Sequence, residues 1–214
     1  TPEMLRQLQG DYADLYALSD APQELGAIEQ LMYPMAAEES TPRSSLRPFS
    51  VPAFAEEQIA AIAFTSGSTG RPTPHRKTWG ALARGATAEA ERFDLHLDGR
   101  ATLLGTVPAQ HMYGLESTVL MALRGGLALH AGRPFYPADV AAALAEIPGD
   151  RVLVTTPVHL RALLNDGIEL PQLCLIVCAT APRSQEMAVQ AQARYRAPLH
   201  EGYGFTAAGM VATR

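Results

Sequence analysis

Apolar and polar positions follow a regular pattern from about residue 58 to the end of the sequence. Short apolar runs of strand length alternate with longer segments in which apolar residues recur at helical spacing. The runs lack a clean two-residue period, and strands that are apolar on both sides are typical of a parallel sheet covered by helices. The pattern therefore predicts an α/β fold, with a mostly parallel sheet and helices on both faces.

The predicted elements alternate along the chain. The expected strands are Ile59–Phe64, Ala101–Val107, Leu127–Ala131, Arg151–Thr155, Leu173–Ala179 and Pro198–Tyr203. The expected helices are Lys77–Phe93, Tyr113–Leu123, Pro137–Ile147, Pro157–Leu164 and Ser184–Arg196.

The first third of the chain carries a weaker pattern. In residues 3–32 polar and apolar positions alternate loosely, and Asp20 with Pro22 predicts a helix that begins near Gln23. Residues 34–52 are rich in proline, serine and threonine, which is typical of a connector. We therefore expect residues 1–57 to be an N-terminal segment with its connector, and residues 58–214 to be the folded core.

Composition and charge narrow the classes of function. The 47% hydrophobic and 18% charged residues are typical of a soluble globular protein. The net charge is -5, with eight acidic and three basic residues in the first 50 and fourteen of each in the rest. Binding of a nucleic-acid backbone needs a clustered basic surface, so no nucleic-acid partner is expected. The sequence contains no run of 18 apolar residues, so no membrane span is predicted. Cys174 and Cys178 are expected to be reduced thiols in a buried strand, and the cytoplasm is the expected location.

A Ser/Gly-rich segment follows the first expected strand. Residues Thr65–Pro72 read TSGSTGRP. Its glycines allow successive backbone N–H groups to surround an anion, and its hydroxyls add further donors. Arg71, Arg76 and Lys77 add positive charge just before a predicted helix. The segment predicts a polyphosphate-binding loop, although it lacks the spacing of a P-loop, and an ordinary Ser/Gly-rich turn is the alternative.

Two further motifs follow later strands. Val107–Gly114 reads VPAQHMYG, and His200–Thr206 reads HEGYGFT. Ligands of open parallel sheets bind at the carboxyl ends of the strands, where these motifs are expected. Taken alone, His111 is more often a structural histidine than a ligand-binding one, and only its place in the motif favours a site.

These three motifs, in this order, resemble the AMP-binding, adenylate-forming superfamily of acyl-CoA synthetases, aryl-acid ligases and peptide-synthetase adenylation domains. Phe64–Pro72 is similar to the signature loop of that superfamily, Val107–Gly114 to its Pro-x-x-His-x-x-Gly element, and Tyr203–Thr206 to its Tyr-Gly-x-Thr element. The resemblance runs from about Ile59 to Arg214 and does not cover residues 1–58. It implies part of the large N-terminal domain of such an enzyme, with the C-terminal domain absent.

The resemblance implies activation of a small carboxylic acid by ATP, with Mg²⁺, to an acyl-adenylate. In the complete enzyme the acyl group then passes to the thiol of CoA or of a carrier protein. The implied catalytic residues are His111, beside the acid, and Thr206, at the α-phosphate. The implied phosphate-binding residues are Thr65, Ser66, Gly67, Ser68, Thr69, Gly70 and Lys77. The implied adenine-binding residues are Ala179, Thr180, Ala181, Pro182, Tyr203 and Gly204.

Two positions depart from the family pattern. Thr73-Pro74 stands where the signature loop usually has Lys-Gly, and Ala207 stands where a glutamate helps to hold Mg²⁺. Alanine offers no oxygen to a cation that requires oxygen ligands, so no metal-ligating residue is predicted. An alternative is therefore a degenerate adenylation fold that binds a nucleotide or a partner without turnover.

A dinucleotide-dependent oxidoreductase is a remote alternative. Gly202-x-Gly204-x-x-Ala207 formally fits the dinucleotide fingerprint. That fingerprint belongs on the first strand of its unit and precedes an acidic residue by about 20 positions, and neither condition holds here.

Overall fold

A computed structural model describes residues 2–19, 21–32, 53–65, 73–95, 100–180, 184–206 and 208–213. The chain divides into two compact units, residues 1–53 and residues 54–214.

The first unit contains helix α1 (Pro2–Asp11) and two short strands, β1 (Tyr16–Ser19) and β2 (Glu29–Met32), which pair in parallel. The helix predicted to begin near Gln23 is wrong, because residues 23–28 form a loop and turn and β2 follows. The Asp-Pro start signal is local, whereas a stable helix needs an apolar face to bury. Apart from Ile28, the residues of this loop are exposed or half-buried.

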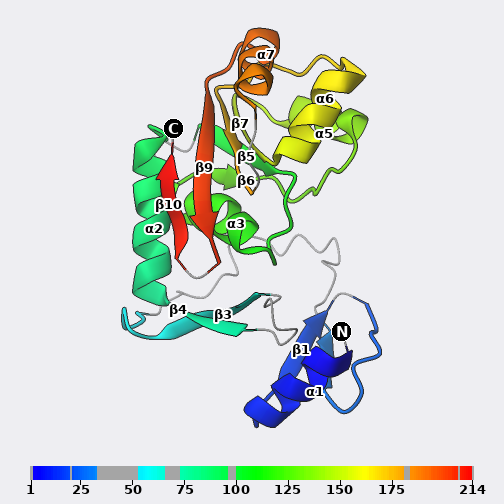
Figure 1. The fold of residues 1–214 in the computed structure, drawn as a ribbon, viewed down its shortest axis with the longest axis vertical. Coiled ribbons are helices and arrows are strands. Elements are labelled where there is room, and N and C mark those ends of the chain that lie inside the picture. Colours follow the sequence, from blue (N-terminus) through cyan, green and yellow to red (C-terminus); the bar gives the residue numbers. More distant parts are fainter. Residues whose placement is uncertain are drawn as a thin grey trace, which may run out of the picture. The chain divides into compact units, whose positions relative to one another are not determined.

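The second unit is built on a six-stranded sheet with the order β10-β9-β8-β7-β5-β6 (Figure 1). Its strands are β5 (Ala101–Gly105), β6 (Ala128–Leu129), β7 (Asp150–Thr155), β8 (Leu175–Cys178), β9 (Leu199–Phe205) and β10 (Gly209–Thr213). All neighbours pair in parallel except β10, which runs antiparallel to β9. The mostly parallel sheet predicted from the apolar runs is confirmed, and β10 is an additional strand.

Helices cover both faces of this sheet, as predicted (Figure 1). The first face carries α2 (Trp79–Arg92) and the segment α3 (Met112–Gly114), η2 (Leu115–Leu120) and α4 (Met121–Gly125), in which η2 is π-helical. The second face carries α5 (Pro137–Glu146), α6 (Pro157–Asp166) and α7 (Gln185–Tyr195). Thr156 and Ser184 cap α6 and α7 by accepting hydrogen bonds from backbone N–H groups of the first turn.

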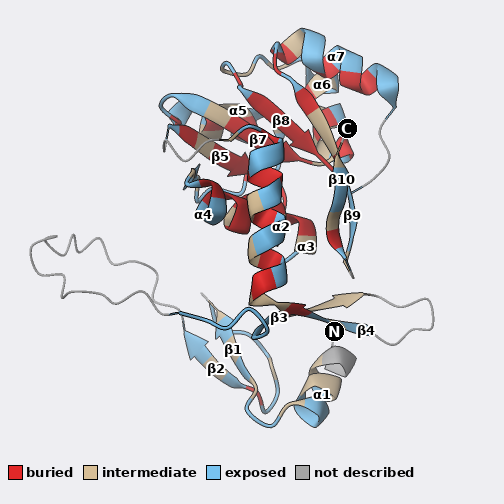
Figure 2. Cartoon of the chain, turned by 90° about the vertical axis from the view of Figure 1, so that its left-hand side faces the viewer, coloured by how far each residue is buried: buried red, intermediate tan, exposed pale blue. Residues whose placement is uncertain are grey.

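Alternate residues of the central strands enter two separate cores. Leu153 and Ile176 pack with α5, α6 and α7, whereas Val152, Val154 and Val177 pack with Phe93, which follows α2, and with the α3–α4 segment. This is the two-residue period of a strand, with both faces apolar. Figure 2 shows β8 and the second part of β7 as buried.

One predicted strand belongs elsewhere. Residues Ile59–Phe64 were expected in the parallel sheet, but β3 (Ile59–Thr65) pairs antiparallel with β4 (Thr73–Thr78) in a separate two-stranded sheet. The helix predicted from Lys77 begins at Trp79, where the Thr78 hydroxyl accepts a hydrogen bond from Ala81 N–H. The polar sequence of β4, TPHRKT, has no apolar run that would identify it as a strand.

Two smaller expectations concern the cysteines and membranes. Both cysteines are free, but only Cys178 is buried, and Cys174 lies exposed ahead of β8. Among the described helices, none combines the length and the apolar character that crossing a membrane requires.

Candidate functional site

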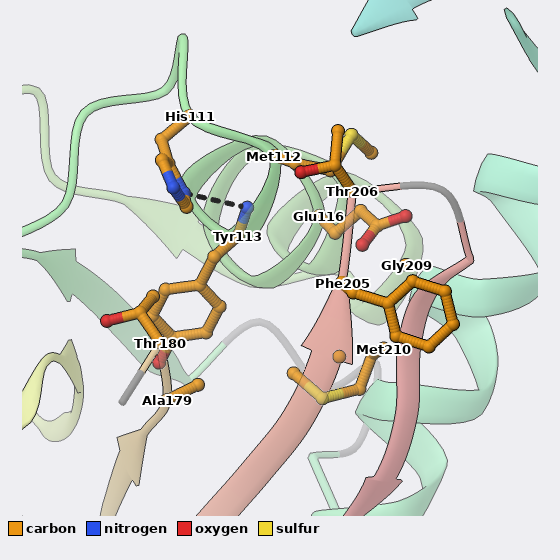
Figure 3. A pocket seen from close by; sticks show the side chains of 11 residues that line it. His111, Met112, Tyr113, Glu116, Ala179, Thr180, Phe205, Thr206, Gly209 and Met210 are labelled. Atoms are coloured by element: carbon orange, nitrogen blue, oxygen red, sulfur yellow. Dashed lines mark hydrogen bonds between the residues drawn. The ribbon is translucent and has the colours of Figure 1, made fainter. Parts of the chain in front are cut away.

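A pocket of about 160 Å³ opens at the carboxyl ends of the parallel strands (Figure 3). Its walls come from the turn after β5 with α3 and η2, from the residues after β8, and from β9 with β10. This is the edge at which ligands of open α/β sheets bind. The lining residues are His111, Met112, Tyr113, Glu116, Ala179, Thr180, Gly204, Phe205, Thr206, Gly209 and Met210.

The pocket brings together five residues singled out from the sequence, namely His111, Ala179, Thr180, Gly204 and Thr206. Thr180 is one of the few non-glycine residues in the left-handed region, with φ of 84°. Such conformations cost of order 1–3 kcal/mol and are concentrated at functional sites.

Other predicted residues lie outside this pocket. Tyr203 is 66% exposed and is not among the lining residues. Thr65 ends β3, where its Oγ1 lies 3.2 Å from Nε2 of His75. Lys77 is buried in β4. The remaining predicted positions, Ser66, Gly67, Ser68, Thr69, Gly70, Ala181, Pro182 and Ala207, lie outside the described residues.

His111 is held at the start of α3. Its Nδ1 accepts a hydrogen bond from Tyr113 N–H at 3.3 Å, which makes it the N-cap of that helix. A neutral imidazole that accepts at Nδ1 carries its proton on Nε2, so the ring keeps one donor for a ligand. Gly114 lets this turn close, since a Cβ there would lie 2.0 Å from the carbonyl oxygen of Pro108.

Tyr113 fixes the α3 segment to the sheet. Its buried hydroxyl lies 3.1 Å from the carbonyl oxygen of Thr155 and 3.2 Å from that of Val177, and it shares its proton between them. Burial raises the pKa of Tyr113 well above its ordinary value, so the hydroxyl stays a donor. The side chain therefore anchors one wall of the pocket to the ends of β7 and β8.

Glu116 supplies a carboxylate to the pocket and was not predicted. Burial raises the pKa of Glu116, while the positive charge of Lys77 and a hydrogen bond from Met210 N–H lower it. Its carboxylate packs against the backbone of Gly209, where a Cβ would lie 2.4 Å from Oε1. Gly209 itself has φ of 83°, which favours glycine. The feature of the sequence that could have identified Glu116 is an acidic residue inside an apolar helical segment.

A second carboxylate lies deeper. Glu89 of α2 is buried, and Oε1 has no hydrogen-bond partner among the described residues. Burial raises the pKa of Glu89 to about 7; the Ser117 hydroxyl lowers it and the charge of Glu116 raises it. The α2 face of the sheet thus contains two carboxyl groups that burial makes harder to ionise.

Comparison with known proteins identifies the family. The family model for AMP-binding enzymes matches residues 11–214. The chain belongs to the AMP-binding enzyme family. The match begins well before Ile59, so the expectation that the resemblance excludes residues 1–58 is wrong. The motifs quoted from the sequence all lie after Ile59, and they carried no information about the earlier part of an AMP-binding enzyme.

Relatives and solved structures agree with this assignment. The chain is 29% identical over 164 residues to 4-coumarate–CoA ligase 1 of Solanum tuberosum, covering 72% of this chain and 30% of that protein. It is 32% identical over 167 residues to 4-coumarate–CoA ligase of Rhodobacter capsulatus, covering 78% of this chain and 42% of that protein. A malonyl-CoA ligase solved with methylmalonyl-CoA and AMP superposes with a TM-score of 0.79 at 22% identity, over 99% of this chain and 46% of that one.

These coverages set the extent of the match. The chain spans about 30% of the length of the first of these ligases and less than half of each of the others. Its fold matches the N-terminal domain of adenylate-forming enzymes.

Proposed function

We propose that this chain is the nucleotide- and acid-binding part of an AMP-forming acid ligase. The observation that carries the proposal is the meeting of His111, Thr180 and Thr206, from three strand ends far apart in the sequence, in one pocket of an AMP-binding fold. The reaction would convert a carboxylic acid and ATP to an acyl-adenylate and pyrophosphate. In the whole enzyme, transfer to the thiol of CoA or of a carrier protein would follow, as the names of the CoA ligase relatives suggest.

The chemistry requires alignment more than covalent participation by the protein. A carboxylate oxygen forms a bond to the α-phosphorus while the bond from that phosphorus to the oxygen of pyrophosphate breaks. In our proposal the Thr206 hydroxyl donates to an α-phosphate oxygen, and the Nε2 proton of His111 faces the acid. Ala179, Thr180 and Gly204, with Tyr203, would hold the adenine. Ser66–Gly70 and Lys77 are proposed for the outer phosphates.

The described residues do not fit a magnesium site formed by the protein. They contain no group of three His, Cys, Asp or Glu side chains able to hold a metal ion. The carboxylate that lines the pocket, Glu116, already interacts with the positive charge of Lys77. Ala207 offers no oxygen. We therefore assign no catalytic step to a metal ion held by these residues.

Nucleotide binding without turnover is the second candidate. Thr73 and Ala207, in place of the usual lysine and glutamate, are the observations that favour it. An active ligase releases pyrophosphate when ATP and an acid are supplied together, whereas a binding module does not. As for setting, we propose that the chain has no nucleic-acid partner, on the charge balance of the sequence. We propose the cytoplasm as its location, on its two free cysteines.

Calorimetric titration of this chain with ATP, AMP and NAD tests the proposal. We expect ATP and AMP to bind and NAD not to bind. Thr206→Val should weaken AMP binding by about tenfold, because a hydrogen bond to a charged group is lost. The matched control is Thr213→Val in β10, whose residue does not line the pocket and whose substitution should leave binding unchanged. A folded sample that binds neither adenine nucleotide contradicts the proposal.

A further inference from the structure

Glu89 of α2 is a carboxyl buried in the part of the core that α2 forms with η2. It is 4% exposed, and its Oε1 has no hydrogen-bond partner among the described residues. The groups that act on it are the Ser117 hydroxyl and a second carboxylate, Glu116. A carboxyl in such surroundings keeps its proton more readily than one in water. The packing of α2 does not require it, because an apolar side chain of similar size would avoid the cost of burying a polar group.

The π-helical segment η2 connects Glu89 with the pocket. Of its consecutive residues, Glu116 lines the pocket, whereas Ser117 is fully buried and acts on Glu89 (Figure 3). The Glu116 carboxylate is held by the close approach of Gly209 and by the N–H of Met210. Turns of π-helix are frequent at functional sites. The negative charge of Glu116 raises the pKa of Glu89, so charge at the pocket wall reaches this buried group.

The other ionisable groups around Glu89 belong to the elements that pack against α2. Tyr113 of α3 interacts with the charge of Glu89, and burial raises its own pKa so far that it stays neutral. Strands β3 and β10 carry no ionisable side chain, and the buried Lys77 of β4 lowers the pKa of Glu116. Arg124 of α4 donates to α2 at an exposed position, and the other ionisable residues of α2 are exposed. Within this set, Glu116 is the charged side chain that acts on Glu89.

A nucleotide in the pocket adds negative charge to this wall. Its phosphate would lie near Glu116 in a site from which water has been displaced, and both effects disfavour a second ionised carboxyl. Proton binding and anion binding then strengthen each other by the same factor. We infer that Glu89 takes up a proton when a nucleotide anion binds, so that the pocket binds its nucleotide more tightly in mildly acidic than in mildly alkaline solution. The inference rests on the proposed function, because it assumes that the anion occupies this pocket.

Proton linkage gives the sign and the size of the effect. The pKa of Glu89 is about 7, so without a nucleotide this carboxyl is about half protonated at pH 7. At lower pH the proton is already bound and affinity is greatest, whereas at higher pH the complex has to acquire the proton. We expect uptake of about half a proton per nucleotide near pH 7.5, and an affinity about fivefold lower at pH 8 than at pH 6.

Calorimetric titration of this chain with adenosine 5′-sulfate tests the inference. A sulfate ester keeps a single charge over this range, whereas the phosphate of AMP has a pKa of about 6 and exchanges protons itself. Titrations at pH 7.5 in HEPES and in Tris, whose ionisation enthalpies differ, give the number of protons taken up. Glu89→Gln should abolish the uptake and make affinity independent of pH between 6 and 8. Glu91→Gln, at an exposed position of α2 outside the pocket lining, is the matched control and should preserve both.

The outcomes are separable. Binding of the sulfate to the wild-type chain without proton uptake overturns the inference and leaves the proposed function standing. Uptake that persists in Glu89→Gln belongs to another group, such as His111 in the pocket lining, and overturns the assignment to Glu89. If AMP binds and the sulfate does not, the difference in proton uptake between the wild type and Glu89→Gln with AMP decides the question. Failure of both nucleotides to bind removes the proposed function and, with it, the inference.

Discussion

The two faces of the six-stranded sheet are built from the same strands but differ in what they bury. The α5–α7 face packs leucine, isoleucine and methionine side chains of the sheet and helices into one apolar core. The other face carries the pocket and the buried Glu89 of α2. Lys77, the second buried charged side chain among the described residues, lies in β4 of the separate two-stranded sheet. Successive residues of a strand point to opposite faces, so the register of the strand determines which core each side chain enters.

The difference is that one face adds a ligand pocket to its apolar core. Burial of each large apolar side chain contributes about 1.5–3 kcal/mol, so the cores on both faces stabilise the fold. Buried ionisable groups lower stability unless they are paired. The charges of Lys77 and Glu89 act on or respond to Glu116, which lines the pocket together with the left-handed Thr180. Perturbed ionisable groups and unusual backbone angles of this kind are typical of ligand sites.

The largest effect should come from a cavity in the apolar face. Leu153 is fully buried against α5, α6 and α7. Leu153→Ala should lower the free energy of unfolding by about 2–5 kcal/mol, from lost burial and an unfilled cavity. Val189→Ala, at an exposed position of α7, serves as the control and should change it by less than about 0.5 kcal/mol. Urea denaturation measures the free energy of unfolding of both variants. Similar decreases in the two would contradict the assignment of Leu153 to the core and Val189 to the surface.

Glu89 should make stability depend on pH. Its pKa is about 7 in the folded state against 4.5 ordinarily, so between these values the unfolded chain releases a proton that the folded chain retains. Stability therefore falls as pH rises from 4.5 to about 7, by about 3 kcal/mol in total, and stays lowered above that.

Glu89→Gln removes this ionisation while keeping the side chain nearly the same size. We expect the free energy of unfolding of the variant not to show the decrease that ionisation of Glu89 causes. The stability of the variant relative to the wild type should therefore increase as pH rises from 5 to 8. Urea denaturation at both pH values checks the slope, with the exposed Glu91→Gln as the reference. Parallel pH profiles for the wild type and Glu89→Gln would mean that Glu89 ionises normally.

Gly209 tests how tightly the pocket wall is packed. Gly209→Ala places a Cβ at φ of 83° and 2.4 Å from Oε1 of Glu116, so the carboxylate must move. Gly149→Ala is a matched control, with φ of 77° and only an ordinary 3.4 Å contact. Each substitution should cost about 1 kcal/mol of backbone strain, and Gly209→Ala should cost more than the control. Equal losses in thermal denaturation would show that Glu116 moves freely.

Much of the fold follows from the sequence because the central strands are unambiguous. Apolar runs such as Arg151–Thr155 have no other stable place than a doubly covered sheet. The β3–β4 hairpin was missed because β4 is polar and resembles a loop before a helix. The helix expected near Gln23 failed for the converse reason, a good local start signal without an apolar face.

The candidate site was predicted in part. The motifs identified His111 and Thr206, since both follow strands at the binding edge of the sheet. Glu116 was missed, because an acidic residue in a helical segment usually faces solvent and only the packing of η2 against β10 places it in the pocket. Lys77 was predicted for the phosphates and stays a prediction there, and in the structure its positive charge also lowers the pKa of Glu116.

Hydrogen exchange with and without AMP tests most directly the claim that one face of the sheet holds the ligand site. We predict that AMP slows exchange of backbone amides in α3, η2 and the ends of β9 and β10, and leaves α5, α6 and α7 unchanged. Equal protection of both faces would indicate general stabilisation without a local site. Absence of any protection at an AMP concentration that saturates calorimetric binding would contradict the assignment of the pocket.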